Sequence, residues 1–380
     1  MERRAKPIYP RNGDEVIFTE LRREVKRTVS LLEEKRRRTI ILKALILPLL
    51  YFAAYTCALA FGNHSLVFYT CYFLMGLLLV SIFLNVIHDA VHGTIFTSEK
   101  LNNAYVYLFD FMGANSFIWK LRHIRFHHNY PNVNGWDTDI EQSSLARVFP
   151  SGSFSRMHKY QHIYLPFLYP LYLANWLLIR DFKDFFNKKK TVRKLIEIPK
   201  IEYVKLFVFK GIFLFYMIVL PKMLLGVSWS VALIAFAIML FTASIASLMV
   251  LLSPHANTES SFPLPNENNR FEHSWMMHML MTTNDITHDN WFTRFFMGCF
   301  NYHVVHHLFP NVNHAYYPEI TTILKQKAKQ YNLPYREYPL ITSLRNHYRL
   351  LKSNRQLENI FEETMSAETF KANELTQLSK

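Results

Sequence analysis

Three groups of closely spaced histidines are the residues of this chain whose types and spacing most clearly indicate chemistry. His88 and His92 are four residues apart, and the segments HIRFHH and HVVHH each carry three more. If these segments are helical, histidines one turn apart share a face and can converge on a common point. A zinc site needs only about four ligands, so eight imidazoles suit two metal ions better than one. The eight are His88, His92, His123, His127, His128, His303, His306 and His307.

A ninth ligand is expected from outside these groups. His255 follows the last long apolar stretch and is the favoured candidate. His278, in the segment HSWMMHM, is its main competitor, along with His273 and His288. The choice between His255 and His278 stays open at the level of sequence.

Other polar residues near the groups have weaker signals. His158 and His162 are also four residues apart, but they have no third partner and sit among aromatic residues, which indicates an interface or channel position. Asp137 and Asp139 follow the second group and could orient ligand rings, since ligating histidines usually donate their second N–H to such a group. Asp89 could make a similar hydrogen bond or point to solvent.

The composition favours a membrane protein. Half of the 380 residues are hydrophobic, 16% are aromatic and only 10 are glycine. The formal net charge of +14 implies a basic face that would attract anionic headgroups, acidic proteins or phosphate-bearing substrates. The basic residues flank apolar stretches and carry no nucleic-acid-binding motif, so we expect no nucleic-acid partner. The cysteines Cys57, Cys71 and Cys299 show no zinc or redox spacing and are expected to be apolar fillers.

Four apolar stretches are long enough to cross the roughly 30 Å hydrocarbon core of a bilayer as helices. We expect them at about 39–61, 66–87, 203–220 and 227–252. They lie in a membrane domain of residues 39–360, between a basic segment, 1–38, and a polar tail, 361–380. Aromatic residues within 160–179 are expected in the membrane interface as an amphipathic helix.

Charge placement sets the expected topology. The run Lys35-Arg36-Arg37-Arg38 precedes the first span, whereas the turn at 62–65 has neither Lys nor Arg, which places the N-terminus in the cytosol. Four spans then return the C-terminus to the same side. This assignment makes no use of histidine, yet it brings every histidine group to one face of the membrane. The basic first segment is expected to be retained and not cleaved as a signal peptide.

The order HDAVH, HIRFHH and HVVHH around two membrane hairpins resembles the integral-membrane fatty acid desaturase and hydroxylase superfamily. The segment NYHVVHHLFPNV, followed by HAYYPEI, is similar to the C-terminal signature of front-end and acyl-lipid desaturases, including the bacterial linoleoyl-CoA desaturase-like branch. The resemblance extends from about Phe18 to Leu351. HHNYPN, DTDI and KYQHIYLPFLY are also similar to the bacterial branch.

The resemblance implies an all-α polytopic fold with four transmembrane helices and a cytosolic helical cap that holds a histidine-ligated di-iron site. It also implies a kinked acyl tunnel, two non-haem iron ions as cofactors and dioxygen as co-substrate, with no catalytic residue beyond the metal ligands. By motif, the ligands would be His88, His92, His123, His127, His128, His255, His303, His306 and His307.

Two features depart from many front-end relatives. Their last histidine group often begins with glutamine, where this chain has His303, so the position of the double bond cannot be read from that label. Many also carry a fused cytochrome b5 domain, whereas the first 38 residues here contain no haem-binding HPGG segment. Electrons are therefore expected from a separate ferredoxin or cytochrome b5 with its reductase, and a basic face suits an acidic donor.

The leading hypothesis is a membrane desaturase that inserts a cis double bond into an acyl-CoA or acyl-lipid, in a bacterial cytoplasmic membrane with its active site and both termini cytosolic. A hydroxylase or carotenoid-type oxygenase on the same scaffold is the enzymatic alternative, and only the product distinguishes it. The non-enzymatic alternative is a histidine-rich metal transporter or a haem-binding protein. Its ligands would lie near mid-bilayer, whereas these groups fall at or beyond the ends of the spans.

Overall fold

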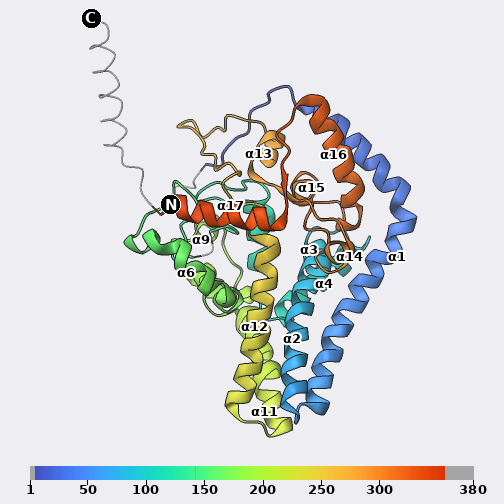
Figure 1. The fold of residues 1–380 in the computed structure, drawn as a ribbon, viewed down its shortest axis with the longest axis vertical. Helices are drawn as coiled ribbons and strands as arrows, with labels where there is room; N and C mark the ends of the chain where they lie inside the picture. Colours follow the sequence, from blue (N-terminus) through green and yellow to red (C-terminus); the bar gives the residue numbers. More distant parts are fainter. Residues whose placement is uncertain (1–4, 142, 356–380) are drawn as a thin grey trace, which may run out of the picture.

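Three long helices lie side by side and form the narrow end of the molecule. The structure is a computed structural model that describes residues 5–141 and 143–355. α2 (Ser65–Ile82) packs between α1 (Glu15–Phe61) and α12 (Trp229–Leu251), as Figure 1 shows. Their apolar sequences explain this arrangement, because each helix needs other helices or lipid to cover its surface. The polar tail expected at 361–380 lies outside the described residues.

The described part of the chain contains five helical stretches that are long and apolar enough to cross a membrane, which indicates a membrane protein. They are Glu15–Phe61, Ser65–Val91, Arg156–Leu195, Lys200–Leu225 and Trp229–Leu251. Three of them contain the expected spans 39–61, 66–87 and 203–220, and the fourth, Trp229–Leu251, lies within the expected span 227–252. The Lys200–Leu225 stretch joins α10 (Lys200–Leu214), π-helix η6 (Phe215–Val219) and α11 (Leu220–Leu225), which lies at the tip of the bundle in Figure 1.

The fifth stretch, Arg156–Leu195, contains the segment expected in the membrane interface. It is a series of short helical pieces, and in Figure 1 its α6 runs obliquely to α12. Pro166 and Pro170 remove backbone donors there, which favours short pieces over one continuous α-helix. The pieces are η3 (Arg156–Tyr160), α6 (Gln161–Leu168), η4 (Tyr169–Leu171), α7 (Tyr172–Asn175), η5 (Trp176–Arg180), α8 (Asp181–Phe186) and α9 (Thr191–Leu195).

α1 is much longer than the apolar stretch it contains. It runs for 47 residues, through the basic run before the expected first span, and its first half rises beside α16 (Tyr317–Tyr331) in Figure 1. Lys327 of α16 lies 3.0 Å from a Glu24 carboxylate oxygen, and Arg36 pairs with Glu319. Ion pairs therefore attach the polar half of α1 to the far end of the chain.

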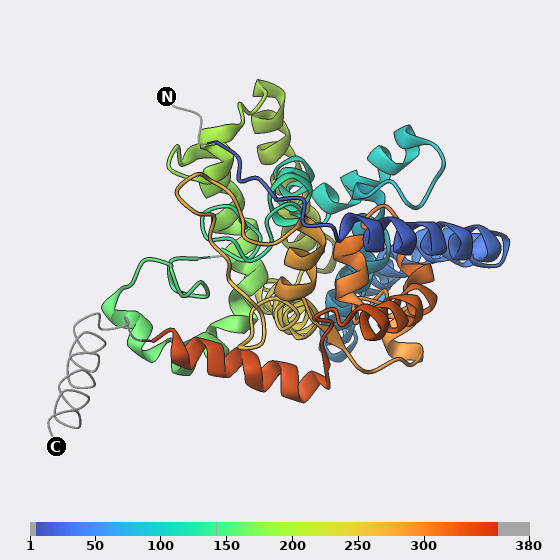
Figure 2. The ribbon, with the colours of Figure 1, turned by 90° about the horizontal axis from the view of Figure 1, so that it is seen from above.

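Short helices at the wide end form a cap over the bundle. They are α13 (Trp275–Thr282), α14 (Trp291–Phe295), α15 (His303–Leu308) and η7 (His314–Tyr316), together with α16. α17 (Leu340–Ser353) lies across the end of α12 (Figures 1 and 2). β1 (Asp285–Ile286) and β2 (Glu337–Tyr338) pair in parallel. Val304 and Leu308 of α15 belong to the same buried cluster as Tyr72 of α2, so cap and bundle share one core.

The segments that carry the first two histidine groups contain π-turns. The α2 helix continues through π-helix η1 (Phe83–Ile87) into α3 (His88–Val91). After α4 (Glu99–Phe111) and α5 (Ser116–Lys120) comes π-helix η2 (Leu121–His127). The turn before α15 approaches η1 closely: a Cβ on Gly298, where φ is +56°, would lie 2.9 Å from the Leu84 carbonyl oxygen. Glycine is therefore required there, both for the backbone angle and for the contact.

Candidate metal centre

Nine histidines that are far apart in the chain meet in two adjacent groups where the cap joins the bundle. From here on, "group" means one of these two sets of rings in space, and not a histidine segment of the sequence. In each group, one nitrogen from every ring lies within 4.8 Å of the others. The first group is His88, His92, His123, His128 and His306, and the second is His127, His255, His303 and His307. These are the nine residues that the sequence singled out. Their ligation of metal remains a prediction.

The structure divides the two three-histidine segments between the groups, where a common point had been expected for each segment. α15 sends His306 to the first group and His303 and His307 to the second. Successive positions on one short helix can do this because His306 projects about 100° away from its neighbour His307. One helix therefore serves both groups.

The π-turn at η2 divides the other segment. The backbone N–H of His128 donates to the His123 carbonyl oxygen, 3.0 Å away, which is a five-residue repeat in place of the four of an α-helix. His123 and His128 consequently share the first group, and His127 turns to the second. An α-helix would have put His123 and His127 on the same face.

Ring nitrogens converge too closely for mutual hydrogen bonding to satisfy them. His123 Nε2 lies 3.0 Å from Nε2 of both His88 and His128. In the second group, His255 Nε2 lies 3.0 Å from His307 Nε2 and 2.7 Å from His303 Nε2. A neutral imidazole nitrogen offers either one proton or one lone pair, so it cannot bond to two such neighbours as donor and acceptor at once. A cation between the rings would satisfy all of them.

Two further nitrogens in the first group are buried without any hydrogen-bond partner among the described residues. These are Nε2 of His92 and Nε2 of His306. The other ring nitrogen of His306 lies 3.2 Å from the Tyr317 hydroxyl, which orients the ring so that Nε2 faces the group. Buried polar atoms are normally paired, so unpaired nitrogens aimed at one point fit a missing metal ion.

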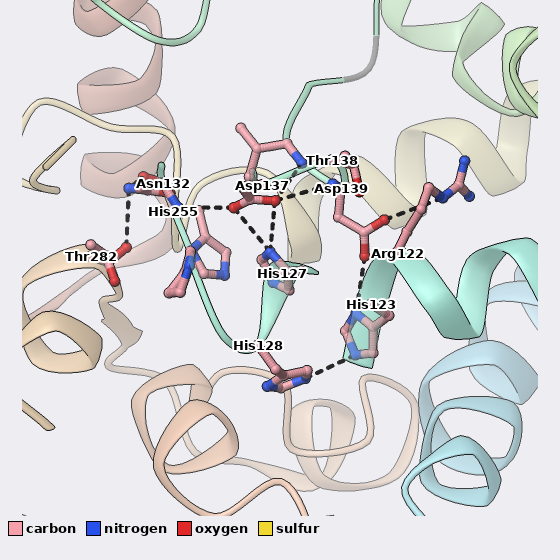
Figure 3. Close-up of polar contacts among 12 residues, drawn as sticks. Arg122, His123, His127, His128, Asn132, Asp137, Thr138, Asp139, His255 and Thr282 are labelled. Atoms are coloured by element: carbon pink, nitrogen blue, oxygen red, sulfur yellow. Dashed lines mark hydrogen bonds and ion pairs between the residues drawn. The ribbon is translucent and has the colours of Figure 1, made fainter. Parts of the chain in front are cut away.

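Carboxylates hold the outer nitrogens of two rings, as the sequence suggested. Asp137 Oδ1 lies 3.0 Å from His127 Nδ1, and Asp139 Oδ2 lies 3.0 Å from His123 Nδ1 (Figure 3). Burial opposes a charge on His127, but the Asp137 carboxylate outweighs burial and raises the pKa of the ring. These contacts direct both Nε2 atoms toward the groups, which is the usual role of a carboxylate behind a metal ligand.

Of the other rings in the two groups, those that lie outside the membrane-spanning segments are kept neutral. Burial, assisted by repulsion among neighbouring imidazoles, lowers their pKa values far below the ordinary value of histidine. The residues are His92, His123, His128, His303, His306 and His307. Burial also lowers the pKa of His255 to about 3. The neutral imidazole is the form that binds metal.

The structure brings His255 into the second group, whereas His278 lies outside both. The Nε2 atom of His278 is 2.9 Å from the Pro131 carbonyl oxygen. Of the described residues, the groups also exclude His158, His162, His273 and His288. The sequence thus favoured the histidine that the geometry places with the others.

Sequence reasoning missed several residues that support the groups. Asn132 donates from Nδ2 to the carbonyl oxygens of His255, 3.0 Å away, and Thr282, 3.2 Å away (Figure 3). The fully buried Arg122 pairs with Asp184, and its Nε atom lies 3.6 Å from Asp139 Oδ1. A buried Asn or Arg has no helical or ligand spacing in the sequence, so nothing marked either residue in advance.

A mostly apolar cavity of about 440 Å³ begins at the two histidine groups. Five of the grouped histidines line one part of it: His88, His123, His127, His255 and His303. The rest of the wall comes chiefly from α6 to η5, from residues between 139 and 148 and from the end of α12, with His347 and Leu351 of α17. The Tyr169 hydroxyl lies 2.6 Å from His347 Nε2 and joins two of these walls. The cavity can hold an apolar chain beside the histidine groups.

Comparison with known proteins places the chain in a family. A family model described as fatty acid desaturase matches residues 63–339. The chain belongs to the fatty acid desaturase family. The matched region contains all nine grouped histidines, and the resemblance expected from the histidine motifs is confirmed. The chain is therefore an oxidoreductase of the desaturase family.

Several characterised desaturases are similar over most of the chain. An acyl-lipid (8-3)-desaturase of Physcomitrium patens is 30% identical over 82% of this chain and 66% of its own length. An sn-1 linoleoyl-lipid 6-desaturase of Synechocystis sp. is 27% identical over 85% of this chain and 90% of its own length. An acyl-lipid (8-3)-desaturase B of Dictyostelium discoideum is 30% identical over 70% of this chain and 60% of its own length. The chain thus spans just under two thirds of the first relative and nearly all of the second.

Proposed function

We propose that this desaturase inserts a cis double bond into the acyl chain of a membrane lipid, at two iron ions held by the nine grouped histidines. The observation that carries the proposal is the apolar cavity, because five of these histidines line it. When bound, the irons would supply the activation of dioxygen that removal of two hydrogens from unactivated methylenes requires, with two electrons from a donor. The names of the relatives, which refer to acyl-lipids and linoleoyl-lipid, support a lipid-linked substrate.

The chemistry of the proposed reaction supports iron over zinc. Imidazole nitrogens bind iron, zinc, copper and nickel, so the donor set admits several metals. Zinc has no redox chemistry, whereas removal of two hydrogens with dioxygen requires a redox-active metal.

The protein's own task is to place one pair of methylenes beside the metal centre. Of the described residues that line the cavity, none is Lys or Arg, so the wall offers no cation to a free carboxylate. This supports an ester-linked acyl chain whose head remains outside. Fixing the chain along the wall aligns one carbon pair with the histidines, and such alignment can contribute several kcal/mol to selection of the reacting bond.

We further propose a topology with four membrane spans and a cytosolic helical cap. The spans would lie in Glu15–Phe61, Ser65–Val91, Lys200–Leu225 and Trp229–Leu251, with Arg156–Leu195 along the membrane interface. The boundaries of the membrane domain at 39 and 360 belong to this proposal. The metal centre and both ends of the chain would then face the cytosol of a bacterium, where a separate ferredoxin or cytochrome b5 with its reductase can reach the basic cap.

Production of the chain in a host that lacks the product tests the function. Fatty acid methyl esters from such cells, supplied with an active electron donor, should contain a new cis-unsaturated species. A His303→Ala variant should insert into the membrane equally well but make no product. Hydroxylated chains in place of alkenes, or no product from wild-type protein that holds iron, would contradict the proposal.

A further inference from the structure

The segment before α1 packs against the cap and does not extend away from it. We call residues 5–14 the N-terminal strap. Figure 2 shows the strap, in dark blue, crossing the molecule to reach α1. It lies outside residues 63–339, which match the family, so family membership assigns it no role.

Backbone hydrogen bonds fix the strap against a loop of the cap. Ile8 donates its N–H to the Asn269 carbonyl oxygen at 2.9 Å, and it accepts from the Phe271 N–H at 2.9 Å. The side chain of Asn269 also donates to the Ala5 carbonyl oxygen, 2.8 Å away. The middle of the strap therefore has a defined register against residues 269–271, which an unattached terminus would not have.

The strap also contacts the chain directly after the second histidine segment. We call residues 128–132 the histidine turn. The Tyr9 hydroxyl donates to the Asn129 carbonyl oxygen at 2.6 Å, and the Tyr130 hydroxyl donates to the Pro7 carbonyl oxygen at 3.3 Å. Asn129 follows His128 of the first group without any intervening residue. Two hydrogen bonds, one in each direction, thus join the strap to the histidine turn.

The ring of Tyr9 also contacts His278, which bonds a second carbonyl of the turn, that of Pro131. It stacks on Phe271 with ring centres 4.6 Å apart, and it meets the His278 ring edge-on at 5.1 Å. His278 Nε2 lies 2.9 Å from the Pro131 carbonyl oxygen. The histidine that competed for the ninth ligand position therefore packs against the strap and holds the turn.

The opposite side of the histidine turn connects to the second group. Asn132 Nδ2 donates to the His255 carbonyl oxygen at 3.0 Å, and the Asn132 N–H donates to Asp137 Oδ2 at 2.9 Å. Asp137 in turn holds Nδ1 of His127. The histidine turn thus connects the strap with His127, His128 and His255, and its own residues lie in turns that follow η2 and not in a helix.

We propose that the N-terminal strap positions the metal centre, with Tyr9 as its main positioning residue. This inference rests on the proposed metal centre. The hydrogen bond from Tyr9 fixes the peptide between Asn129 and Tyr130, one residue beyond His128, while the Tyr9 ring packs against His278, which bonds Pro131. Loss of these contacts lets the histidine turn shift and lets the histidines release metal, because ligands must be held to within about 0.5 Å for tight binding.

Metal release from the purified full-length protein tests the strap directly. Tyr9→Phe keeps the stacked ring and removes only the hydroxyl that bonds Asn129. Because one hydrogen bond of this kind is worth about a factor of five to ten, we expect iron to pass to a coloured ferrous chelator about five-fold faster than from wild type. Tyr130→Phe, which breaks the other bond to the strap, should act in the same direction.

Asn12→Ala is the matched control, because Asn12 lies on the strap but bonds the Glu272 carbonyl oxygen, 3.3 Å away, and not the turn. Asn12→Ala should release iron at the wild-type rate. The metal-free forms of all three variants should unfold at temperatures close to that of metal-free wild type. Wild-type release rates in both tyrosine variants would overturn the inference. So would equal acceleration in Asn12→Ala, which would mean that the strap only stabilises the fold. A wild-type protein that binds no iron would instead remove the proposed function.

Discussion

Asp89 lies between His88 and His92 in the sequence, yet its carboxylate binds His314, with Oδ2 2.6 Å from Nδ1. The same oxygen accepts from the Asn313 side chain at 2.6 Å, and Asp89 is buried. The helix that carries the first two histidines is thereby tied to the segment after α15. The acidic residue inside the first motif thus links two parts of the site.

Replacement of Asp89 should destabilise the protein more than it weakens the metal centre. Asp89→Ala leaves His314 Nδ1 buried without its acceptor and leaves Asn313 only its longer contacts with Thr94, at 3.3 and 3.4 Å. We expect the free energy of unfolding to fall by about 3 kcal/mol. Asp89→Asn retains an acceptor and should cost roughly half as much. Thermal unfolding in detergent, followed alongside iron content, measures both. An Asp89→Ala protein as stable as wild type would refute this account of the contact.

His255 and His278 should differ sharply in iron content. His255→Ala removes one of four nitrogens from the second group, so we expect iron to fall from about two to about one per chain. His278→Ala leaves both groups complete and should retain about two. Metal analysis of the purified variants decides between them. Equal loss in the two variants would mean that His278 also holds iron.

His347 should make the stability of the protein depend on pH. Burial lowers its pKa to about 4 from 6.5, and its neutral ring bonds Tyr169 through Nε2 and the Ala256 carbonyl oxygen through Nδ1, each at 2.6 Å. Between these pH values the unfolded chain binds a proton that the folded protein does not. The free energy of unfolding therefore rises by up to about 3 kcal/mol as the pH increases from about 4 to 6.5. Above pH 6.5 this contribution no longer changes.

Comparison of wild type with His347→Gln isolates this contribution from the other histidines. The variant has no titratable group at the site, so its unfolding temperature should fall less steeply than that of wild type as the pH drops from 6.5 to 4. Parallel curves for the two proteins would show that His347 takes up its proton in the folded state as readily as in the unfolded chain.

Narrowing the cavity should change which acyl chains react. Ala174 lines the cavity in α7, and Ala174→Phe would fill space beside the path of the chain. We expect the longest substrates to lose at least about ten-fold in conversion, since one or two methylenes of misfit cost roughly 1–3 kcal/mol. Ala53→Phe is the control, because Ala53 is exposed on α1 and does not line the cavity.

Fatty acid methyl ester profiles from cells fed chains of several lengths give the measurement. An Ala174→Phe profile that matches both wild type and Ala53→Phe would mean that the substrate does not pass this residue.

The histidines themselves could be predicted from the sequence, because their spacing repeats in three segments and ordinary packing does not require it. Their division into two groups could not. Whether His127 joins His123 or turns away depends on the π-turn at η2, and a single extra residue per turn leaves no signature in composition or periodicity. The supporting residues Asn132 and Arg122 were equally hidden, because their roles arise from contacts across more than a hundred residues or with buried carboxylates.

Four of the five apolar helical stretches in the described residues were also predictable, since length and hydropathy determine them, whereas Arg156–Leu195 was expected only in part, as an interface helix. Helix ends were less so. α1 begins at Glu15, far before its apolar half, because its polar half is held by contacts with α16 that no local pattern reveals. The strap was missed for the same reason: Tyr9 finds its partners more than a hundred residues away.

The π-turn at Leu121–His127 makes the local winding of the helix as important there as residue identity. If the same residues wound as an α-helix, His127 would take the face of His123, which His128 has now, and His128 would point about 100° further round. The second group would then lose a ring although every histidine remained in the gene. Sequence libraries built on this scaffold can vary the residues of this segment only where the π-turn is kept.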